Sequence, residues 1–175
     1  KPGNIFAAQR GGVYDVAKLL DFGLVKPLVD DEHSVELSTD GAITGSPLFM
    51  SPEQALGDGR PDARSDVYSL GAVGYFLVTG HPPFEDRRPI KVMIAHAHHK
   101  VSPPSTHVPD LPRDLEAVIL RCLEKAPSDR YQTAVELGHA LRACDAAGQW
   151  TVADAVRWWR SPDTERGPCK IGAAS

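Results

Sequence analysis

Hydrophobic and polar positions change their spacing near residue 50. Before that point two short stretches, Ile5 to Gln9 and Val13 to Leu20, are typical of β-strands, and Arg10, Gly11 and Gly12 separate them. Glycines tolerate the positive φ of a tight hairpin turn. A glycine-rich phosphate loop is the alternative, but neither GxGxxG nor GxxxxGK[ST] spacing occurs and no helix follows. The pattern therefore predicts a β-hairpin at the N-terminal end.

From Ser51 onward the spacing is helical. Residues 66 to 79 are apolar nearly all round, which predicts a helix buried on every side, with Gly80 as a left-handed cap and two prolines after it. Further helices are expected at Ile90 to His98 and at Leu115 to Leu123. Another should follow a capping box formed by Thr133 and Glu136, with Leu137, Leu141 and Cys144 on one face. A last helix is expected at Thr151 to Trp159, with its Trp side chains packed on the body.

Two polar segments lack a period. Residues 26–47 are rich in Asp, Ser, Thr and Gly and predict a long surface loop, a class of segment that is usually functional or disordered. Residues 161–175 hold Pro162, Gly167 and Pro168 and predict a flexible tail.

Composition narrows the class of protein. Of the 175 residues, 42% are hydrophobic, and the net charge of −4 without a basic block argues against nucleic-acid binding. The longest apolar run, Leu70 to Val78, is shorter than the roughly 20 residues that cross a bilayer. Cys122, Cys144 and Cys169 are odd in number and widely spaced, which favours reduced thiols. We therefore predict a cytoplasmic protein without a membrane segment in these residues.

Five short motifs occur in a fixed order. They are Lys1-Pro2-Gly3-Asn4, Asp21-Phe22-Gly23, Ser51-Pro52-Glu53, Asp66 to Gly71, and Arg121-Cys122-Leu123 through Asp129-Arg130-Tyr131. Singly, each has an ordinary structural explanation: Asp21-Phe22-Gly23 could be a turn, Asn4 an Asx turn and Phe6 a core residue. Together and in order, they resemble the C-terminal lobe of a protein kinase, closest to the bacterial, eukaryotic-like (Hanks-type) serine/threonine kinases.

The resemblance implies an α+β fold, a kinase-like C-lobe that is mostly α-helical with a short β-hairpin at the N-terminus. It implies a partial catalytic domain over residues 1–145, entered at the end of the catalytic loop. A C-terminal helix packed on the lobe is expected over residues 146–160, before the tail at 161–175.

The resemblance also assigns an ATP and Mg²⁺ site. Asn4 and Asp21 would hold the metal ions, since Mg²⁺ takes hard oxygen ligands. Lys1 would neutralise the transferred phosphate, and Phe6 would form the apolar floor beneath the adenine. Lys1 and Ser46 are the catalytic candidates. At the position of Ser46 the family usually has Thr, and the hydroxyl of that Thr bridges the catalytic Asp and Lys. Both residues imply protein Ser/Thr substrates.

Other residues have structural roles by the same resemblance. Phe22 and Gly23 complete the metal-binding motif. Glu53 and Arg130 would form a buried ion pair that fixes the activation segment, the stretch from Asp21 to Glu53, because the planar guanidinium meets a carboxylate bidentately. Asp66 would accept hydrogen bonds from the catalytic-loop backbone, and a simple helix N-cap is its compatible alternative.

Hydroxyl residues before Gly45 are candidate phosphosites. In related kinases an activating phosphate lies a few positions before the Gly-Ser/Thr pair that corresponds to Gly45-Ser46. Ser38 and Thr39 are therefore the first candidates and Thr44 the next, while Ser34 lies further away. Solvated loop hydroxyls are the alternative.

Three histidines, His96, His98 and His99, lie close together in the sequence. No Glu or Cys at ligand spacing accompanies them, so we predict a partly exposed, histidine-rich helix end rather than a metal site.

Some kinase motifs are not among these residues: the glycine-rich lid, the β3 Lys with its Glu partner, and the catalytic-loop Asp. We therefore expect the full-length protein to phosphorylate Ser/Thr, and the 175 residues alone to be inactive and to expose apolar surface. A pseudokinase or scaffold with the kinase fold, and a non-kinase helical interaction domain, are the alternatives.

Overall fold

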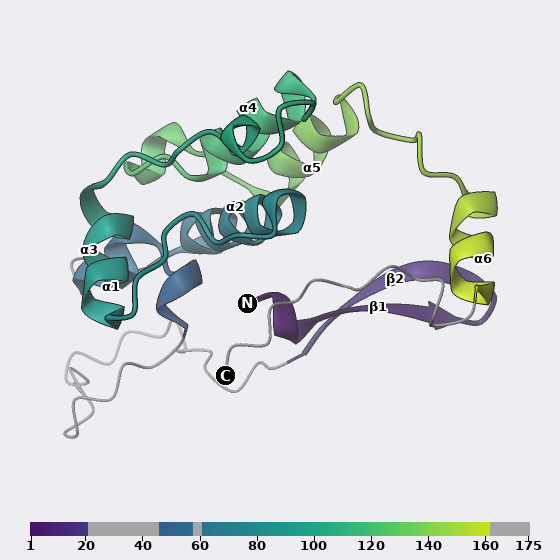
Figure 1. The fold of residues 1–175 in the computed structure, drawn as a ribbon, viewed down its shortest axis with the longest axis horizontal. Coiled ribbons are helices and arrows are strands. Elements are labelled where there is room, and N and C mark those ends of the chain that lie inside the picture. Colours follow the sequence, from purple (N-terminus) through teal and green to yellow (C-terminus); the bar gives the residue numbers. More distant parts are fainter. Residues whose placement is uncertain (21–45, 58–60, 162–175) are drawn as a thin grey trace.

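A β-hairpin followed by a group of helices makes up the chain (Figure 1). The computed structural model describes residues 1–20, 46–57 and 61–161. This arrangement, mostly helical with a two-stranded sheet at the N-terminal end, confirms the predicted α+β class. The elements in chain order are η1 (Pro2–Asn4), β1 (Ile5–Arg10), β2 (Val13–Leu19), η2 (Pro47–Phe49), α1 (Pro52–Leu56), α2 (Ala63–Thr79), α3 (Pro89–His98), η3 (Pro104–Thr106), α4 (Arg113–Cys122), η4 (Pro127–Asp129), α5 (Ala134–Arg142) and α6 (Val152–Arg160), where η denotes a 3₁₀ turn.

The predicted hairpin is present. Strands β1 and β2 pair antiparallel from Ile5 opposite Leu19 to Arg10 opposite Val13, with an irregularity between Ala8 and Arg10. Gly11 and Gly12 have φ values of 57° and 84°, and positive φ at both central residues is what a two-residue turn of this kind requires. No residue of either strand is fully buried.

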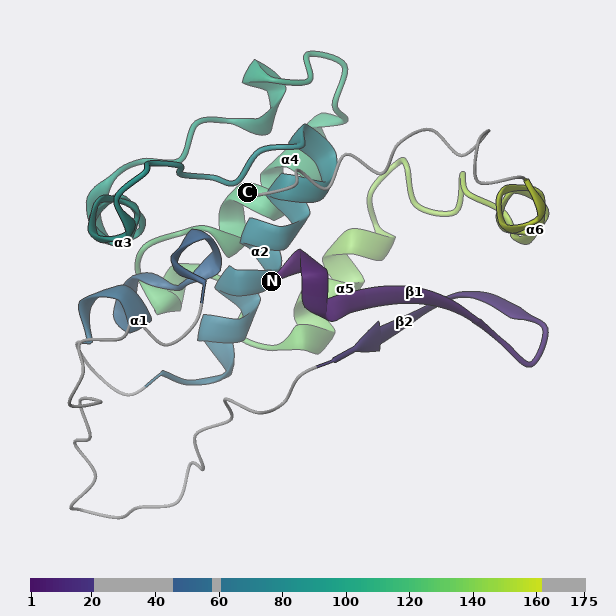
Figure 2. The ribbon, with the colours of Figure 1, turned by 60° about the horizontal axis from the view of Figure 1, so that its bottom comes forward.

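Helix α2 lies in the middle of the helical group, packed against α4 (Figure 2). It begins at the N-cap Asp62, whose carboxylate accepts the Arg64 N–H, and it ends at Gly80, which has the predicted left-handed conformation. The prediction of burial on every side was wrong: the exposed fractions of Leu70 and Leu77 are 47% and 71%. These two positions form one stripe, and no described element covers it. The expectation of exposed apolar surface is thus confirmed.

The core of the helical group forms two clusters of buried side chains. One joins α2, α4 and α5 around Val67, Val118, Cys122, Tyr131, Leu137 and Cys144, and the other surrounds Tyr68, Ala72, Tyr75, Val101, Ile119 and Leu123. Cys122 and Cys144 are free thiols, as predicted, whereas Cys169 lies outside the described residues.

Helix α5 differs from its prediction in two details. Thr133 caps the helix by accepting the Glu136 N–H, but the Glu136 carboxylate binds the N–H of Gln132 rather than that of Thr133, so the capping box is incomplete. Leu141, expected on the buried face, is 42% exposed. Ala140 packs against the core instead, because the face that contacts the core runs through positions 137, 140 and 144.

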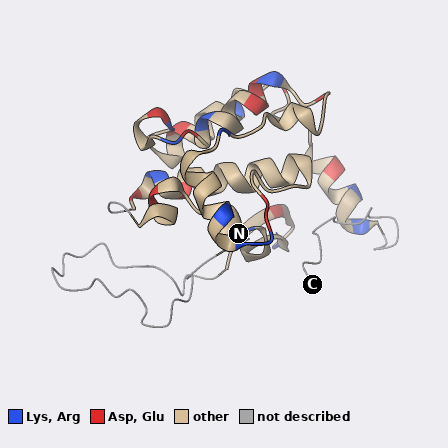
Figure 3. Cartoon of the chain, turned by 60° about the vertical axis from the view of Figure 1, so that its left-hand side comes forward, with Lys and Arg blue, Asp and Glu red and all other residues tan. Residues whose placement is uncertain are grey.

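The last helix, α6, packs against β2 and not against the other helices (Figure 1). Thr151 and Asp154 form a complete capping box at the start of α6, and Ala155 is the buried residue of this helix. Acidic and basic residues are interspersed along the described helices (Figure 3). No described helix has the length and apolar character that crossing a membrane requires.

Candidate active site

The segment assigned to the catalytic loop forms the turn η1 and is joined to the end of the hairpin. The Asn4 N–H donates to the Lys1 carbonyl at 3.0 Å, and the Asn4 carbonyl accepts the Leu20 N–H at 2.7 Å. The Asn4 side chain is half-buried and makes no hydrogen bond with another described residue. Its backbone is therefore held by hydrogen bonds at both N–H and carbonyl, and its side-chain amide oxygen is of the hard type that suits Mg²⁺. Lys1 is exposed.

Phe6 stands on β1 opposite Lys18, and half of its surface is exposed. Leu19 and Leu20, at the end of β2, are exposed to a similar extent. A phenyl ring in that position has an accessible face that an aromatic or apolar group can cover.

Several predicted residues lie outside the described part of the chain. These are Asp21, Phe22, Gly23 and the candidate phosphosites Ser34, Ser38, Thr39 and Thr44. Most of the predicted loop at 26–47 lies there too.

Ser46 is the N-cap residue of η2 and has extended backbone geometry (φ −95°, ψ 110°). The turn that follows it is held to α2, because the Phe49 carbonyl accepts the Ser69 hydroxyl at 2.8 Å and the Phe49 ring meets Phe76 edge to face. The position of Ser46 is thus tied to the central helix.

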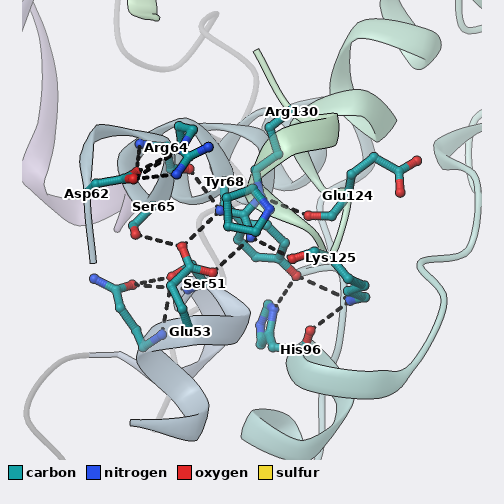
Figure 4. Close-up of polar contacts among 12 residues, drawn as sticks. Ser51, Glu53, Asp62, Arg64, Ser65, Tyr68, His96, Glu124, Lys125 and Arg130 are labelled. Atoms are coloured by element: carbon teal, nitrogen blue, oxygen red, sulfur yellow. Dashed lines mark hydrogen bonds and ion pairs between the residues drawn. The ribbon is translucent and has the colours of Figure 1, made fainter. Parts of the chain in front are cut away.

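Arg130, fully buried, is the centre of the largest polar network described (Figure 4). Its five N–H donors make five hydrogen bonds: two to the carboxylate of Glu53, and one each to the carbonyls of Glu124, Arg64 and Lys125. The guanidinium also lies 5.0 Å from the centre of the Tyr68 ring. The predicted Glu53–Arg130 pair is therefore formed, and no donor of the buried cation is left unsatisfied.

Glu53 has a second partner that the sequence analysis missed. The buried Ser65 hydroxyl donates to the Glu53 carboxylate at 2.6 Å. Burial by itself raises the pKa of Glu53, but the hydrogen bonds from Arg130 and Ser65 outweigh it and lower that pKa to about 2. Glu53 is thus held as a carboxylate. Ser51, also buried, begins α1 with a complete capping box to Gln54.

A second buried network was also missed. The Tyr68 hydroxyl and His96 Nδ1 are 2.9 Å apart, and Lys125 Nζ donates to the His96 carbonyl at 2.8 Å. The predicted partly exposed, histidine-rich helix end is present: His98 and His99 are exposed, whereas His96 is fully buried. Tyr68 appeared in the sequence only as one apolar position among many, so its polar end gave no signal.

The N-cap of α2, the alternative role considered for Asp66, belongs to Asp62 instead. Asp66 is exposed in the first turn of α2, and Asp62 is the residue that caps the helix. Asp66 makes no hydrogen bond with the other described residues. Within the described ranges, no group of three or more His, Cys, Asp or Glu is arranged to hold a metal ion.

Comparison with known proteins shows to which family the chain belongs. The model of the protein kinase domain matches residues 1–141. The chain belongs to the protein kinase family. Every described site residue, from Lys1 to Arg130, lies within the matched range, whereas α6 follows it.

Bacterial relatives of this kinase chain specify the group. It is 38% identical over 172 residues, 95% of the chain, to the serine/threonine-protein kinase PknB of Mycolicibacterium smegmatis. It is 43% identical over 137 residues, 78% of the chain, to PknB of Mycobacterium tuberculosis, and 42% identical over 142 residues, 81% of the chain, to Pkn1 of Myxococcus xanthus. These matches confirm the resemblance to bacterial Hanks-type kinases. The matched regions cover 26%, 21% and 20% of these relatives, so the kinase chain corresponds to about a quarter of their length.

Proposed function

We propose that the full-length protein transfers the γ-phosphoryl group of ATP to Ser or Thr residues of protein substrates. The observation that carries this proposal is that Lys1, Asn4 and Asp21 are all present at their motif positions in a chain of the kinase family. A pseudokinase would have no need of all three. The hydrogen bond between Asn4 and Leu20, the residue before Asp21, supports it.

Each residue has a defined part in this chemistry. Asn4 and Asp21 would hold Mg²⁺, which when bound neutralises and orients the phosphates. Lys1 would place its ammonium group on the γ-phosphate as negative charge shifts during transfer. Phe6 would support the adenine, and Ser46 would link Lys1 to the catalytic Asp through its hydroxyl. The Glu53–Arg130 pair acts indirectly, by fixing the end of the segment that carries Ser46.

The test uses the full-length protein with radiolabelled ATP, Mg²⁺ and a degenerate Ser/Thr/Tyr peptide library. We expect label on Ser and Thr, and loss of at least a thousandfold in rate for Asp21→Ala, because the metal loses a protein ligand. Asp110→Asn, which removes an exposed carboxylate in the loop before α4, is the charge-matched control. Nucleotide binding without transfer in the wild-type protein would indicate a pseudokinase. The 175 residues assayed alone should not transfer phosphate.

Activation by phosphorylation is part of the same proposal. A phosphate adds about −1.5 to −2 charges and orders a loop when an arginine pairs with it. Phosphate mapping by mass spectrometry of the active full-length protein should find it on Ser38, Thr39 or Thr44. The Ser38→Ala/Thr39→Ala double variant should then be less active. Unchanged activity, or phosphate only outside residues 34–44, would remove this part and leave the catalytic proposal intact.

A further inference from the structure

Asp15 is held by two tryptophans from the other end of the chain. Its Oδ1 accepts the indole N–H of Trp159 at 2.7 Å, and its Oδ2 accepts the indole N–H of Trp150 at 2.8 Å. Among the described non-glycine residues, Asp15 alone has positive φ, at 56°. Such a conformation is unfavourable for most residues and persists where the surroundings enforce it.

The two tryptophans flank helix α6. Trp150 precedes the N-cap Thr151, and Trp159 lies in the last turn, so one carboxylate is bound from both ends of the helix. Between them Ala155 is buried, with 3% of its surface exposed, where α6 packs against β2. Figure 1 shows α6 lying across the far end of the hairpin, away from the other helices. The indole N–H groups also lower the pKa of Asp15, Trp159 first, so the carboxylate stays charged.

Among the described elements, α6 is the one that makes the main contact with the hairpin. Neither strand has a fully buried residue, and α6 is the described element that packs most closely on it. The same hairpin carries Phe6 on β1, and β2 continues through Leu20 to Asp21 in the sequence. A contact that orients β2 therefore acts on the strand that leads into the proposed metal ligand.

We propose that residues 146–160 form a strap that fastens on Asp15 and sets the orientation of the β1–β2 hairpin for binding of ATP with Mg²⁺. Asp15 is then a positioning residue, which acts through Phe6 and the end of β2 without touching the nucleotide. The strap follows the range matched by the family model, which ends at residue 141. The effect on ATP binding rests on the proposed function. The docking of the strap on Asp15 is independent of it.

Two variants isolate the contact. Asp15→Asn keeps the size and the tolerance of positive φ while it removes the charge and one acceptor oxygen. Trp159→Phe keeps an aromatic ring and removes the indole donor. Asp110→Asn again serves as the charge-matched control, because Asp110 is exposed and remote in sequence from the hairpin and the strap.

The first measurement is docking, by the indole ¹H–¹⁵N signals of the full-length protein. Asp15→Asn should shift the signals of Trp150 and Trp159 and speed their hydrogen exchange, and Asp110→Asn should leave both unchanged. Unchanged indole signals in Asp15→Asn would mean that the strap does not dock on Asp15, which overturns the proposal.

The second measurement is ATP affinity in the presence of Mg²⁺, by calorimetry, together with steady-state kinetics. Asp15→Asn and Trp159→Phe should each raise the Kd and the KM for ATP about three- to tenfold, the scale of one charge-assisted hydrogen bond at an exposed site, with kcat within about twofold. An equal loss in kcat with unchanged Kd, or no effect on either, would overturn the positioning role. A protein that transfers no phosphate but still loses ATP affinity in these variants contradicts the proposed function and supports the strap.

Discussion

Both carboxylate oxygens of Glu53 accept an N–H from Arg130 at 2.9 Å, although 77 positions separate the two residues in the sequence. The pair joins the first turn of α1 to the loop after η4. Arg130 also binds the carbonyls of Arg64, Glu124 and Lys125, so a single side chain joins α1, the start of α2 and the loop between α4 and α5.

Glu53→Gln should lower the free energy of unfolding by about 3–5 kcal/mol, because it leaves the guanidinium of Arg130 buried without a counter-charge. Denaturant unfolding measures the difference. Lys91→Gln removes the exposed ion pair with Asp86 and is the control, with an expected change below about 1 kcal/mol. Equal effects of the two substitutions would show that the buried pair is not a principal anchor of the fold.

Gly71 and Gly74 give a matched pair of tests on the packing of α2 against α4. A Cβ atom at Gly71 would overlap the Cβ of Cys122, whereas one at Gly74 would find Ile119 Cγ1 at 3.7 Å, an ordinary contact. Alanine favours helices over glycine by about 1 kcal/mol, so Gly74→Ala should be neutral or stabilising. Gly71→Ala should instead lower stability by about 1–3 kcal/mol. Thermal and denaturant unfolding of both variants distinguishes packing from helix propensity, and a stabilised Gly71→Ala would contradict the close approach.

The pH dependence of stability should report the burial of His96. Burial lowers the pKa of His96 from 6.5 to about 4, against a smaller opposing effect of the Leu48 backbone. Between these values the unfolded chain binds a proton that the folded protein does not, so stability should fall as pH decreases from about 6.5 toward 4. Urea unfolding between about pH 7 and 5 measures the slope. His96→Gln should flatten it, and His98→Gln, at an exposed position, should not.

Local periodicity predicted the hairpin and the helices because these depend on residues close in the sequence. Gly80 ends α2 and Thr133 caps α5 for the same reason. The order of the five motifs then predicted the family. It also predicted the Glu53–Arg130 pair, a contact that periodicity cannot show.

Contacts between distant segments were the part that could not be predicted from spacing. Leu70 and Leu77 fit a buried helix, yet their exposure depends on which elements lie against α2. His96 and His98 both lie in the last turn of α3, and each follows an alanine, yet His96 contacts Tyr68 while His98 is exposed. The binding of Asp15 to both Trp150 and Trp159 joins positions more than 130 residues apart and has no signature in composition.

Ser46 offers a test of one catalytic assignment apart from the metal ligands. Its hydroxyl precedes a turn that Ser69 ties to α2, and its backbone is extended, a conformation that a β-branched residue also favours. Ser46→Thr should therefore keep the hydroxyl in place, and we expect kcat/KM of the full-length protein to stay within about threefold of the wild-type value. Ser46→Ala removes the hydroxyl and should lower kcat/KM by about 10- to 100-fold, the scale of one hydrogen bond to a charged group.

Ser102→Ala, at an exposed position before η3, controls for the loss of a surface hydroxyl and should leave the rate unchanged. The unfolding free energy of each variant must be compared as well, because a drop in activity that follows a drop in stability would not identify a catalytic role. Full activity in a stable Ser46→Ala protein would remove Ser46 from the catalytic residues. That result would not contradict the kinase proposal, because Ser46→Ala tests only the link between Lys1 and the catalytic Asp. The proposal itself is tested by Asp21→Ala, which removes a metal ligand.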